Sequence, residues 1–224
     1  MKVTVDAVVF AYIEKELYVL LIKRAFEPFI NQWALPGGFM NEDESADKSV
    51  VRKLKEETNV DVKINYLEQL YTFTNVNRDP RERIISISYY ALINPMEHDL
   101  TTNIHAKEVC WFPISQVQHL NIAFDHKSII NSGRNRLKNK IVYEPIGFEL
   151  LPKQFSLTDL YDLYVSILGK EIDRSNFVKK INGFQLLKKT KNKTEGHVGR
   201  RAQLFEFDKN KYEELLINGF VFDI

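Results

Sequence analysis

The sequence predicts an α/β domain over residues 1–144, followed by a small α+β domain over residues 145–224. Segments with strand and helix patterns alternate in the first part, whereas the second part places two helices before a pair of strands. The turn Pro145-Ile146-Gly147 separates the two parts. With 224 residues, 44% of them hydrophobic and 27% charged, the chain is long and apolar enough for two modest globular domains.

The first domain is predicted to begin with two strands and a long helix. Strands at 3–10 and 17–23 flank the turn Glu14-Lys15-Glu16. The stretch from Glu44 to Thr58 contains no Gly or Pro, and its apolar residues recur at helical spacing, as in Val50 and Leu54. The elements expected after it are strands near 62–74, 84–93 and 107–112 and helices near 113–119 and 126–138.

The second domain carries clear helix-start and helix-stop signals. Ser156 is followed three residues later by Asp159, which resembles a capping box, and Gly169 ends the helix. Asp173 is expected to cap a second, basic helix, Arg174 to Asn182. Strands at 184–190 and 201–207 then flank a basic loop, 191–200. Helix, turn, basic helix and basic hairpin is the order of a winged helix-turn-helix.

The stretch from Gly37 to Val60 holds the most specific pattern in the chain. From Gly38, five residues lead to Glu44 and seven more lead to Arg52, followed by Lys53-Leu54-Lys55-Glu56-Glu57. This closely resembles the Nudix box, G-x5-E-x7-R-E-U-x-E-E-x-G-U with U apolar. In the Nudix family that loop–helix–loop holds a divalent metal against a diphosphate.

Two positions depart from the box, because Lys53 replaces a glutamate and Asn59 replaces a glycine. A magnesium site needs several carboxylates at one spot. An ammonium three residues from Glu56 removes a ligand and repels the ion, by roughly 4 kcal/mol per charge pair at ~4 Å and an effective dielectric of about 20. We therefore expect no catalytic residue, no required cofactor, and Glu56 and Glu57 as weak or vestigial metal ligands. The alternative is an active ADP-ribose or nucleoside-diphosphate pyrophosphatase that uses Glu56 and Glu57 with Mg²⁺.

Basic residues are concentrated in the second domain. Residues 174–201 contain nine Lys and Arg and one acid, a net charge of 9 − 1 = +8, which indicates a polyanion-binding face. The first residues of a recognition helix lie near base edges, and later lysines lie near phosphates. The predicted DNA-binding residues are Arg174, Ser175, Asn176, Lys179, Lys180, Lys191, Lys193, Arg200 and Arg201. A small domain used for dimerisation or scaffolding is the alternative.

The chain as a whole resembles the Nudix-related transcriptional regulators of bacteria. Beyond the box, the resemblance is carried by Asn77-Arg78-Asp79-Pro80-Arg81, by Ala123-Phe124-Asp125-His126 and by the stretch from Gly199 to Phe205. It implies a degenerate Nudix α/β/α sandwich with a mixed sheet that senses ADP-ribose, an NAD-related nucleotide or a sugar such as a pentose. It also implies a winged helix that binds double-stranded operator DNA, and a homodimer.

The predicted effector-binding residues lie in two loops. Arg78, Arg81 and Arg83 are expected to bind phosphate or ribose by forked hydrogen bonds, with a merely charged hairpin loop as the alternative. The turn Gly37-Gly38 lets a backbone approach a ligand closely. The adjacent Phe39 either stacks on a base or sugar or packs in the core. Asp125 is expected to cap the helix that follows it.

Cysteine content and hydropathy indicate the compartment. The single cysteine, Cys110, excludes an intrachain disulfide and fits a reducing cytoplasm. The longest apolar run, Leu17 to Ile22, is too short to span a bilayer, and no basic-then-apolar leader suggests secretion. The sequence therefore predicts a cytoplasmic protein with no membrane partner.

Overall fold

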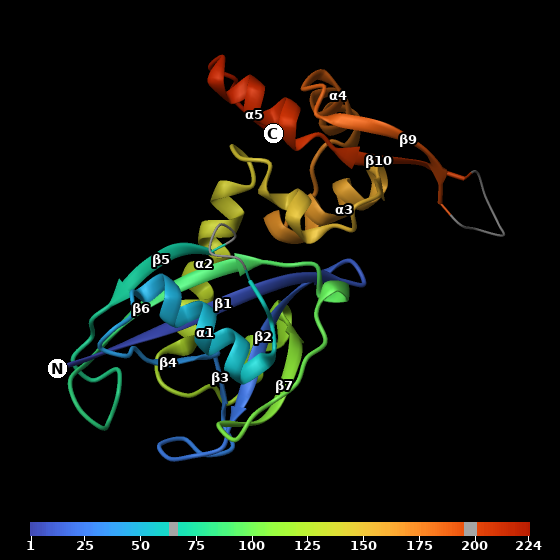
Figure 1. Ribbon diagram of the computed structural model, residues 1–224. Helices are drawn as coiled ribbons and strands as arrows, with labels where there is room; N and C mark the ends of the chain where they lie inside the picture. Colours follow the sequence, from blue (N-terminus) through green and yellow to red (C-terminus); the bar gives the residue numbers. More distant parts are fainter. Residues whose placement is uncertain (63–66, 195–200) are drawn as a thin grey trace. The chain divides into compact units, whose positions relative to one another are not determined.

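The computed structural model describes residues 1–62, 67–194 and 201–224, which form two compact units (Figure 1). The first unit comprises residues 1–13 and 17–136, and the second comprises residues 14–16 and 137–224. The units divide within helix α2 (His126–Lys140), which precedes the turn around Pro145 where the sequence predicts the domain boundary. Within the described part of the chain, no helix combines the length and the apolar character needed to cross a membrane.

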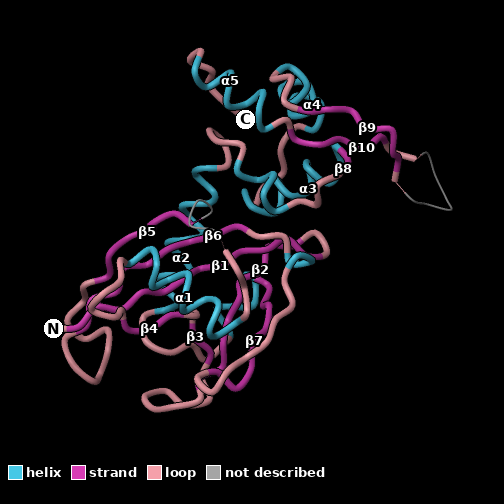
Figure 2. The backbone as a smooth tube through the Cα atoms, in the orientation of Figure 1, coloured by secondary structure: helices cyan, strands magenta, loops and turns pink. Residues whose placement is uncertain are grey.

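A mixed sheet forms the centre of the first unit (Figure 2). Its order is β3-β2-β1-β6-β5, with β4 paired to β1 and β7 paired to β2. Strands β1 and β6 are parallel, whereas the pairs β1–β4, β2–β3, β2–β7 and β5–β6 are antiparallel. The strands are β1 (Lys2–Ile13), β2 (Glu16–Arg24), β3 (Trp33–Ala34), β4 (Gly37–Phe39), β5 (Leu67–Phe73), β6 (Ile84–Leu92) and β7 (Ala106–Pro113). The helices are α1 (Ala46–Thr58), α2 (His126–Lys140) and two 3₁₀ helices, η2 (Pro95–Glu97) and η3 (Ile114–His119).

Strand β1 contains a continuous run of buried residues. Because successive side chains of a strand point to opposite sides, β1 is buried on both faces. Val5 and Val9 belong to the same buried cluster as Leu54 of α1. On the opposite face, Val8 lies against Gly133 of α2, where an added Cβ would come within 3.2 Å of the valine Cγ1. The sheet therefore lies between α1 and α2, and the predicted α/β/α sandwich with a mixed sheet is confirmed.

Helix α1 has defined ends that explain one departure from the Nudix box. Ser45 is its N-cap, and the serine hydroxyl accepts a hydrogen bond from the backbone N–H of Lys48 at 3.4 Å. Asn59 follows the helix in the left-handed conformation, with φ of 61°. Asparagine tolerates this conformation better than other residues with a Cβ, and its side chain also donates to the carbonyl of Asp99 at 2.9 Å. The loss of glycine therefore leaves the helix end intact.

The second unit combines helices with a three-stranded sheet of order β8-β10-β9. Ser156 and Asp159 form the predicted capping box, Gly169 ends the helix with φ of 65°, and Asp173 caps the next helix. Phe177 of that second helix packs on Tyr164, with ring centroids 5.0 Å apart. The elements are 3₁₀ helix η4 (Ile146–Leu150), β8 (Phe155–Ser156), α3 (Leu157–Leu168), α4 (Arg174–Gly183), β9 (Leu187–Lys193), β10 (Gln203–Phe207) and α5 (Lys209–Ile217).

Several predicted elements differ in position or type. Strand β9 runs from Leu187 to Lys193, so Lys191 and Lys193 lie on the strand and not in the loop where they were expected. The predicted helix near 113–119 is a 3₁₀ helix, and part of the strand predicted at 62–74 lies outside the described residues. Helix α5 and the short strands β3, β4 and β8 were not predicted. Elements of two or three residues carry no readable periodicity, and α5 buries none of its residues.

Candidate functional site

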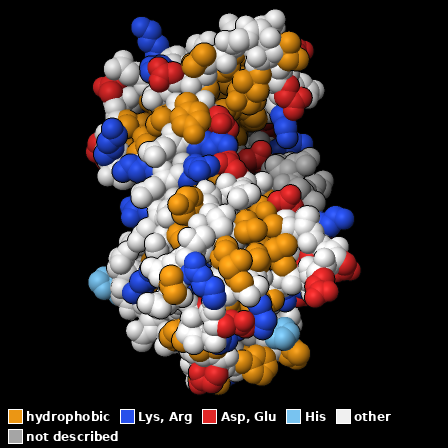
Figure 3. Space-filling model, turned by 90° about the vertical axis from the view of Figure 1, so that its left-hand side faces the viewer, with side chains coloured by type: hydrophobic (Ala, Val, Ile, Leu, Met, Phe, Trp, Pro, Cys, Tyr) orange, Lys and Arg blue, Asp and Glu red, His pale blue; other side chains and the backbone are white. Residues whose placement is uncertain are grey.

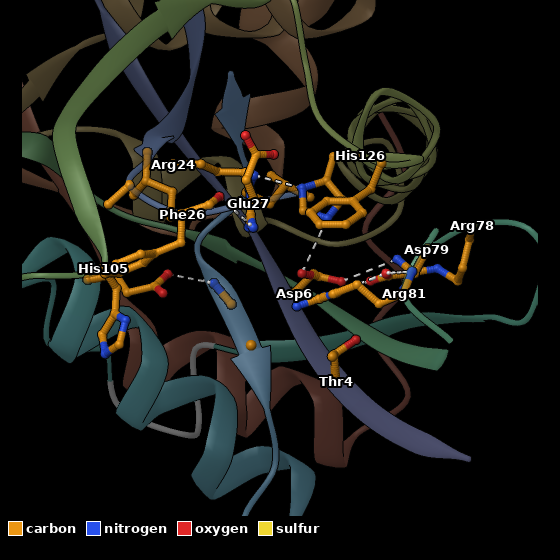
Figure 4. A pocket seen from close by; sticks show the side chains of 17 residues that line it. Thr4, Asp6, Arg24, Phe26, Glu27, Arg78, Asp79, Arg81, His105 and His126 are labelled. Carbon is orange, nitrogen blue, oxygen red and sulfur yellow. Dashed lines mark hydrogen bonds and ion pairs between the residues drawn. The ribbon is translucent and has the colours of Figure 1, made fainter. Parts of the chain in front are cut away.

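A pocket of about 200 Å³ opens in the first unit beside Gly37 and Gly38, which lie on strand β4 and not in the turn that the sequence predicts (Figure 4). An added Cβ at Gly37 would come within 2.2 Å of the Val5 carbonyl oxygen, so only glycine fits at this wall. The charged and titratable side chains that decide the chemistry come from four elements and one loop: Asp6 on β1, Arg24 at the end of β2, Glu57 on α1, Arg78 and Arg81 in the β5–β6 loop, and His126 at the start of α2.

The base of the pocket is a buried ionic cluster. The Arg78 side chain is only 3% exposed, and its Nε and Nη2 donate to the two carboxylate oxygens of Asp125 at 3.0 and 2.7 Å. The same Nη2 lies 3.6 Å from Asp6, which accepts a short hydrogen bond from the Ser86 hydroxyl. The Asp125 side chain therefore pairs with Arg78 and does not cap α2. Its backbone carbonyl accepts the N–H of Ser128 in the first turn.

His126 joins this cluster as a neutral imidazole. Its Nδ1 accepts a hydrogen bond from the backbone N–H of Leu35 at 2.9 Å, so the proton of the neutral ring belongs on Nε2. That nitrogen lies 3.5 Å from Asp6. Burial lowers the pKa of His126, which keeps the ring uncharged at neutral pH. The histidine therefore links the Leu35 backbone to the buried carboxylate.

Glu57 points from α1 into the pocket. It is 6% exposed and accepts a hydrogen bond from the backbone N–H of Gly37 at 2.9 Å. Burial raises the pKa of Glu57 from its usual 4.5 to about 7, although the Gly37 hydrogen bond and the charge of Lys53 oppose the rise. Near neutral pH this carboxyl is therefore present in both its protonated and its charged forms.

The other carboxylates of the box are held by cations. Arg52 donates a short hydrogen bond to Glu44, holding the pKa of Glu44 at about 2, and also donates to Glu56 at 3.2 Å. The Lys53 ammonium donates a hydrogen bond to Glu56 at 3.2 Å. The Lys53 side chain also lies against Gly38, where an added Cβ would come within 3.1 Å of the lysine Cε. Among the described residues, no three acidic, histidine or cysteine side chains are grouped as metal ligands. This donor set does not fit a bound Mg²⁺, because an ammonium stands beside Glu56.

The predicted effector-binding residues are only partly brought together. Gly37, Gly38, Arg78 and Arg81 line the pocket. Phe39 is not a lining residue, but its ring lies 5.1 Å from the Arg81 guanidinium. Arg83 is exposed and does not line the pocket. The Arg81 guanidinium donates to both oxygens of the adjacent Asp79 carboxylate, at 2.9 and 2.7 Å.

The lining residues that were not predicted as site residues include Asp6, Arg24, Phe124 and His126. They are far apart in the sequence and meet because the end of β2 and the start of α2 lie beside the first half of β1. A single carboxylate within the otherwise apolar strand around Asp6 was the one local signal.

A second candidate site lies on the second unit. Five predicted DNA-binding residues are exposed on α4: Arg174, Ser175, Asn176, Lys179 and Lys180. The Arg174 guanidinium is oriented by α3, because it donates to the Thr158 hydroxyl at 2.7 Å and lies 5.3 Å from the Tyr161 ring. Lys180 lies 3.3 Å from Asp223. The helix therefore presents polar and basic side chains that a duplex can contact.

The hairpin adds further positive charge. Lys191, Lys193 and Arg201 line a surface hollow of the second unit, together with Gln154. Arg200, also predicted to bind DNA, lies outside the described residues. On the face of the molecule that Figure 3 shows, basic side chains are mixed with acidic and hydrophobic ones. The basic character is therefore a property of α4 and the hairpin, and not of the whole surface.

Comparison with known protein families matches both parts of the chain. Residues 2–132 match the NUDIX domain, and residues 147–207 match the NrtR DNA-binding winged helix domain. The first match covers more than half of the chain, and the second contains α3, α4, β9 and β10. The two candidate sites therefore lie in two domains of different known families.

Relatives with the same two-domain organisation are known. The ADPR responsive transcriptional repressor NtrR of Acinetobacter baylyi is 33% identical over 94% of this chain and 83% of its own length. A crystal structure of Shewanella oneidensis NrtR complexed with a 27mer DNA covers 94% of this chain and 95% of that chain, with 35% identity and a TM-score of 0.81.

The first domain also matches a ligand complex. The NUDIX domain of Shewanella oneidensis NrtR complexed with ADP ribose is 39% identical, with a TM-score of 0.58 over 61% of this chain and 88% of that chain. The likeness to the DNA-bound NrtR structure covers 94% of this chain and so includes both the pocket-bearing sheet and the winged helix. The chain therefore belongs to the NrtR family of Nudix-related transcriptional regulators.

Proposed function

We propose that this protein is a transcriptional repressor whose winged helix binds operator DNA and whose Nudix domain binds ADP-ribose in the pocket beside Gly37. The likeness to a DNA-bound NrtR over 94% of the chain is the observation that carries the proposal. The relative from Acinetobacter baylyi is described as ADPR responsive, and the related NUDIX domain was crystallised with ADP ribose. Effector binding in one domain would change the affinity of the other for DNA.

The pocket suits a ligand that carries phosphates and hydroxyls. Its lining includes the guanidinium groups of Arg24, Arg78 and Arg81, of which Arg78 and Arg81 are paired with aspartates. A guanidinium recognises phosphate by paired hydrogen bonds. The pocket also contains the neutral carboxyl or carboxylate of Glu57. Binding without hydrolysis is the role that the Lys53 ammonium favours, because it takes up the Glu56 carboxylate that would otherwise be a metal ligand.

The DNA-binding part of the proposal rests on α4 and the hairpin. Ser175 and Asn176 lie in the first turn of α4, where a recognition helix meets base edges. Lys179, Lys191 and Lys193 are exposed cations that would contact phosphates. We further propose that the protein binds DNA as a homodimer, so that two recognition helices read two half-sites. Light scattering of the free protein and of its DNA complex tests that stoichiometry.

A gel-shift experiment with fragments from upstream of its own gene and of neighbouring genes tests the function. We expect one fragment to be retarded at nanomolar protein, and ADP-ribose to release it. AMP together with ribose 5-phosphate, the two halves of the effector, serves as the control and should release much less. No retarded fragment at any salt concentration would refute repression. Retardation that ADP-ribose leaves unchanged would refute the assigned effector.

Hydrolysis is a second candidate function, and one observation favours it. The pKa of Glu57 is about 7, which is the value that suits a general base at neutral pH. If the protein is a pyrophosphatase, ADP-ribose with Mg²⁺ will yield AMP and ribose 5-phosphate, and Glu57→Gln will abolish the products. We expect no such turnover on the time scale of the binding experiments, and chromatography of the same reaction mixtures measures it.

A further inference from the structure

We propose that Arg24 is a diphosphate-binding residue, and that Arg24 and Arg81 form a fixed cationic clamp on the ring of Phe124. This inference rests on the proposed function, because it assigns the place where the diphosphate of ADP-ribose binds. It adds a residue that the sequence pattern did not indicate. It also assigns the neutralisation of the ligand to side chains, without a divalent metal.

The charge balance of the pocket singles out Arg24. Arg78 donates two hydrogen bonds to the carboxylate of Asp125, and Arg81 donates two to the carboxylate of Asp79. Arg24 instead donates to two backbone carbonyls, from Nε to Pro28 at 2.8 Å and from Nη2 to Phe26 at 3.3 Å. Among the described residues, it is the pocket guanidinium without a carboxylate in salt-bridge contact. Its charge is therefore available to a ligand.

The carbonyl contacts also fix how Arg24 is presented. They hold one edge of the guanidinium against the loop that follows β2, and a guanidinium has more N–H donors than these two bonds use. The remaining donors can form a forked pair of hydrogen bonds with a phosphate. Because these two bonds orient the side chain, little rotamer entropy is lost on binding.

Phe124 brings the two arginines together. Its ring centroid lies 4.8 Å from the Arg24 guanidinium carbon and 5.6 Å from that of Arg81, both within the range of cation–π attraction. The Phe124 ring also packs against the rings of Phe29 and His126, whose centroids lie 4.8 and 5.2 Å from its own. Phe124 has a φ of 55°, a conformation that is unfavourable for a bulky side chain. The fold thus maintains a strained residue as the platform of this pair.

Two guanidinium groups on one ring repel each other, and an anion that contacts both relieves the repulsion. Burial first, and then the charge of Arg81, lower the pKa of Arg24, which is consistent with two nearby cations in a partly desolvated site. A diphosphate supplies negative charge on two adjacent groups and so can contact both arginines. Adenosine and ribose carry none, so the clamp selects the phosphate-bearing middle of the effector.

Calorimetric titration of the full chain with ADP-ribose, in EDTA and then in Mg²⁺, tests the clamp. The change is Arg24→Gln, which keeps a polar side chain and removes the charge. Lys55→Gln is the matched control, since Lys55 is an exposed cation on α1 that contacts only the Asn59 carbonyl among its recorded hydrogen bonds and does not line the pocket. We expect Arg24→Gln to weaken ADP-ribose binding by roughly 10- to 100-fold, the range of one charged hydrogen-bonding partner, and Lys55→Gln to leave it unchanged.

The native protein provides a test that does not depend on the variant folding. In EDTA, inorganic pyrophosphate should displace ADP-ribose, whereas adenosine at the same concentration should displace much less. Equal affinity of the native and Arg24→Gln proteins would overturn the clamp, as would a strict requirement for Mg²⁺ or no displacement by millimolar pyrophosphate. A native protein that binds no ADP-ribose in either buffer would refute the proposed effector instead, so the two failures are distinguishable.

Discussion

The buried carboxyl of Glu57 should make the first domain less stable at alkaline pH. The pKa of Glu57 is raised from 4.5 to about 7 by burial, so the folded protein retains a proton that the unfolded chain has lost between these two values. The free energy of unfolding therefore falls as pH rises through this window and stays low above it. Each pKa unit corresponds to about 1.36 kcal/mol, so 2.5 units (7 − 4.5) amount to about 3 kcal/mol at pH 8.

Glu57→Gln removes the titration and keeps the shape. The amide oxygen can still accept the hydrogen bond from the Gly37 backbone, which is 2.9 Å long in the native protein. We expect the variant to be more stable than the native protein by up to about 3 kcal/mol at pH 8 and by less than about 1 kcal/mol at pH 5. The destabilising carboxyl would then be a residue retained for the ligand and not for the fold.

Urea unfolding followed by tryptophan fluorescence measures this difference in the correct domain, because both tryptophans, Trp33 and Trp111, lie in the first unit. Glu56→Gln is the matched control. Burial raises the pKa of Glu56, but hydrogen bonds from Arg52 and Lys53 outweigh burial and lower this pKa. Removing the Glu56 charge should therefore slightly destabilise the protein at pH 8. The reasoning would be contradicted if the Glu57→Gln protein were no more stable than the native protein at pH 8 and the difference in stability between the two proteins were the same at pH 5.

Four further substitutions address the rest of the molecule. Arg78→Ala leaves buried carboxylates without their partner and should destabilise the first domain by ~3–5 kcal/mol in the same urea assay; a loss under 1 kcal/mol would contradict a buried ion cluster. Lys53→Glu should create a site that Mg²⁺ stabilises, seen as a Mg²⁺-dependent rise in melting temperature that the native protein lacks. Lys179→Ala should weaken binding to all duplexes alike and reduce the salt slope by about 1, whereas Asn176→Ala should change sequence preference; the reverse pattern would exchange their roles.

The local sequence determined the helices that carry both sites. The spacing of Glu44, Arg52 and Glu56 identified the Nudix box, and the caps at Ser156 and Gly169 placed α3 within a residue of its observed ends. These features depend on residues three to eight positions apart, so they are legible in one sequence. The lysine in the box also indicated correctly that an ammonium would stand beside Glu56.

Only the tertiary structure decided what the pocket is made of. Arg78 pairs with Asp125, 47 residues away along the chain, and His126 accepts a hydrogen bond from Leu35, 91 residues away. No local periodicity encodes such contacts, since they arise when the fold brings the start of α2 and the β5–β6 loop beside the sheet. The sequence thus determined the family, the helix ends and the basic hairpin. Which arginines are neutralised, and which one keeps its charge for a ligand, depended on long-range pairing that exists only in the folded chain.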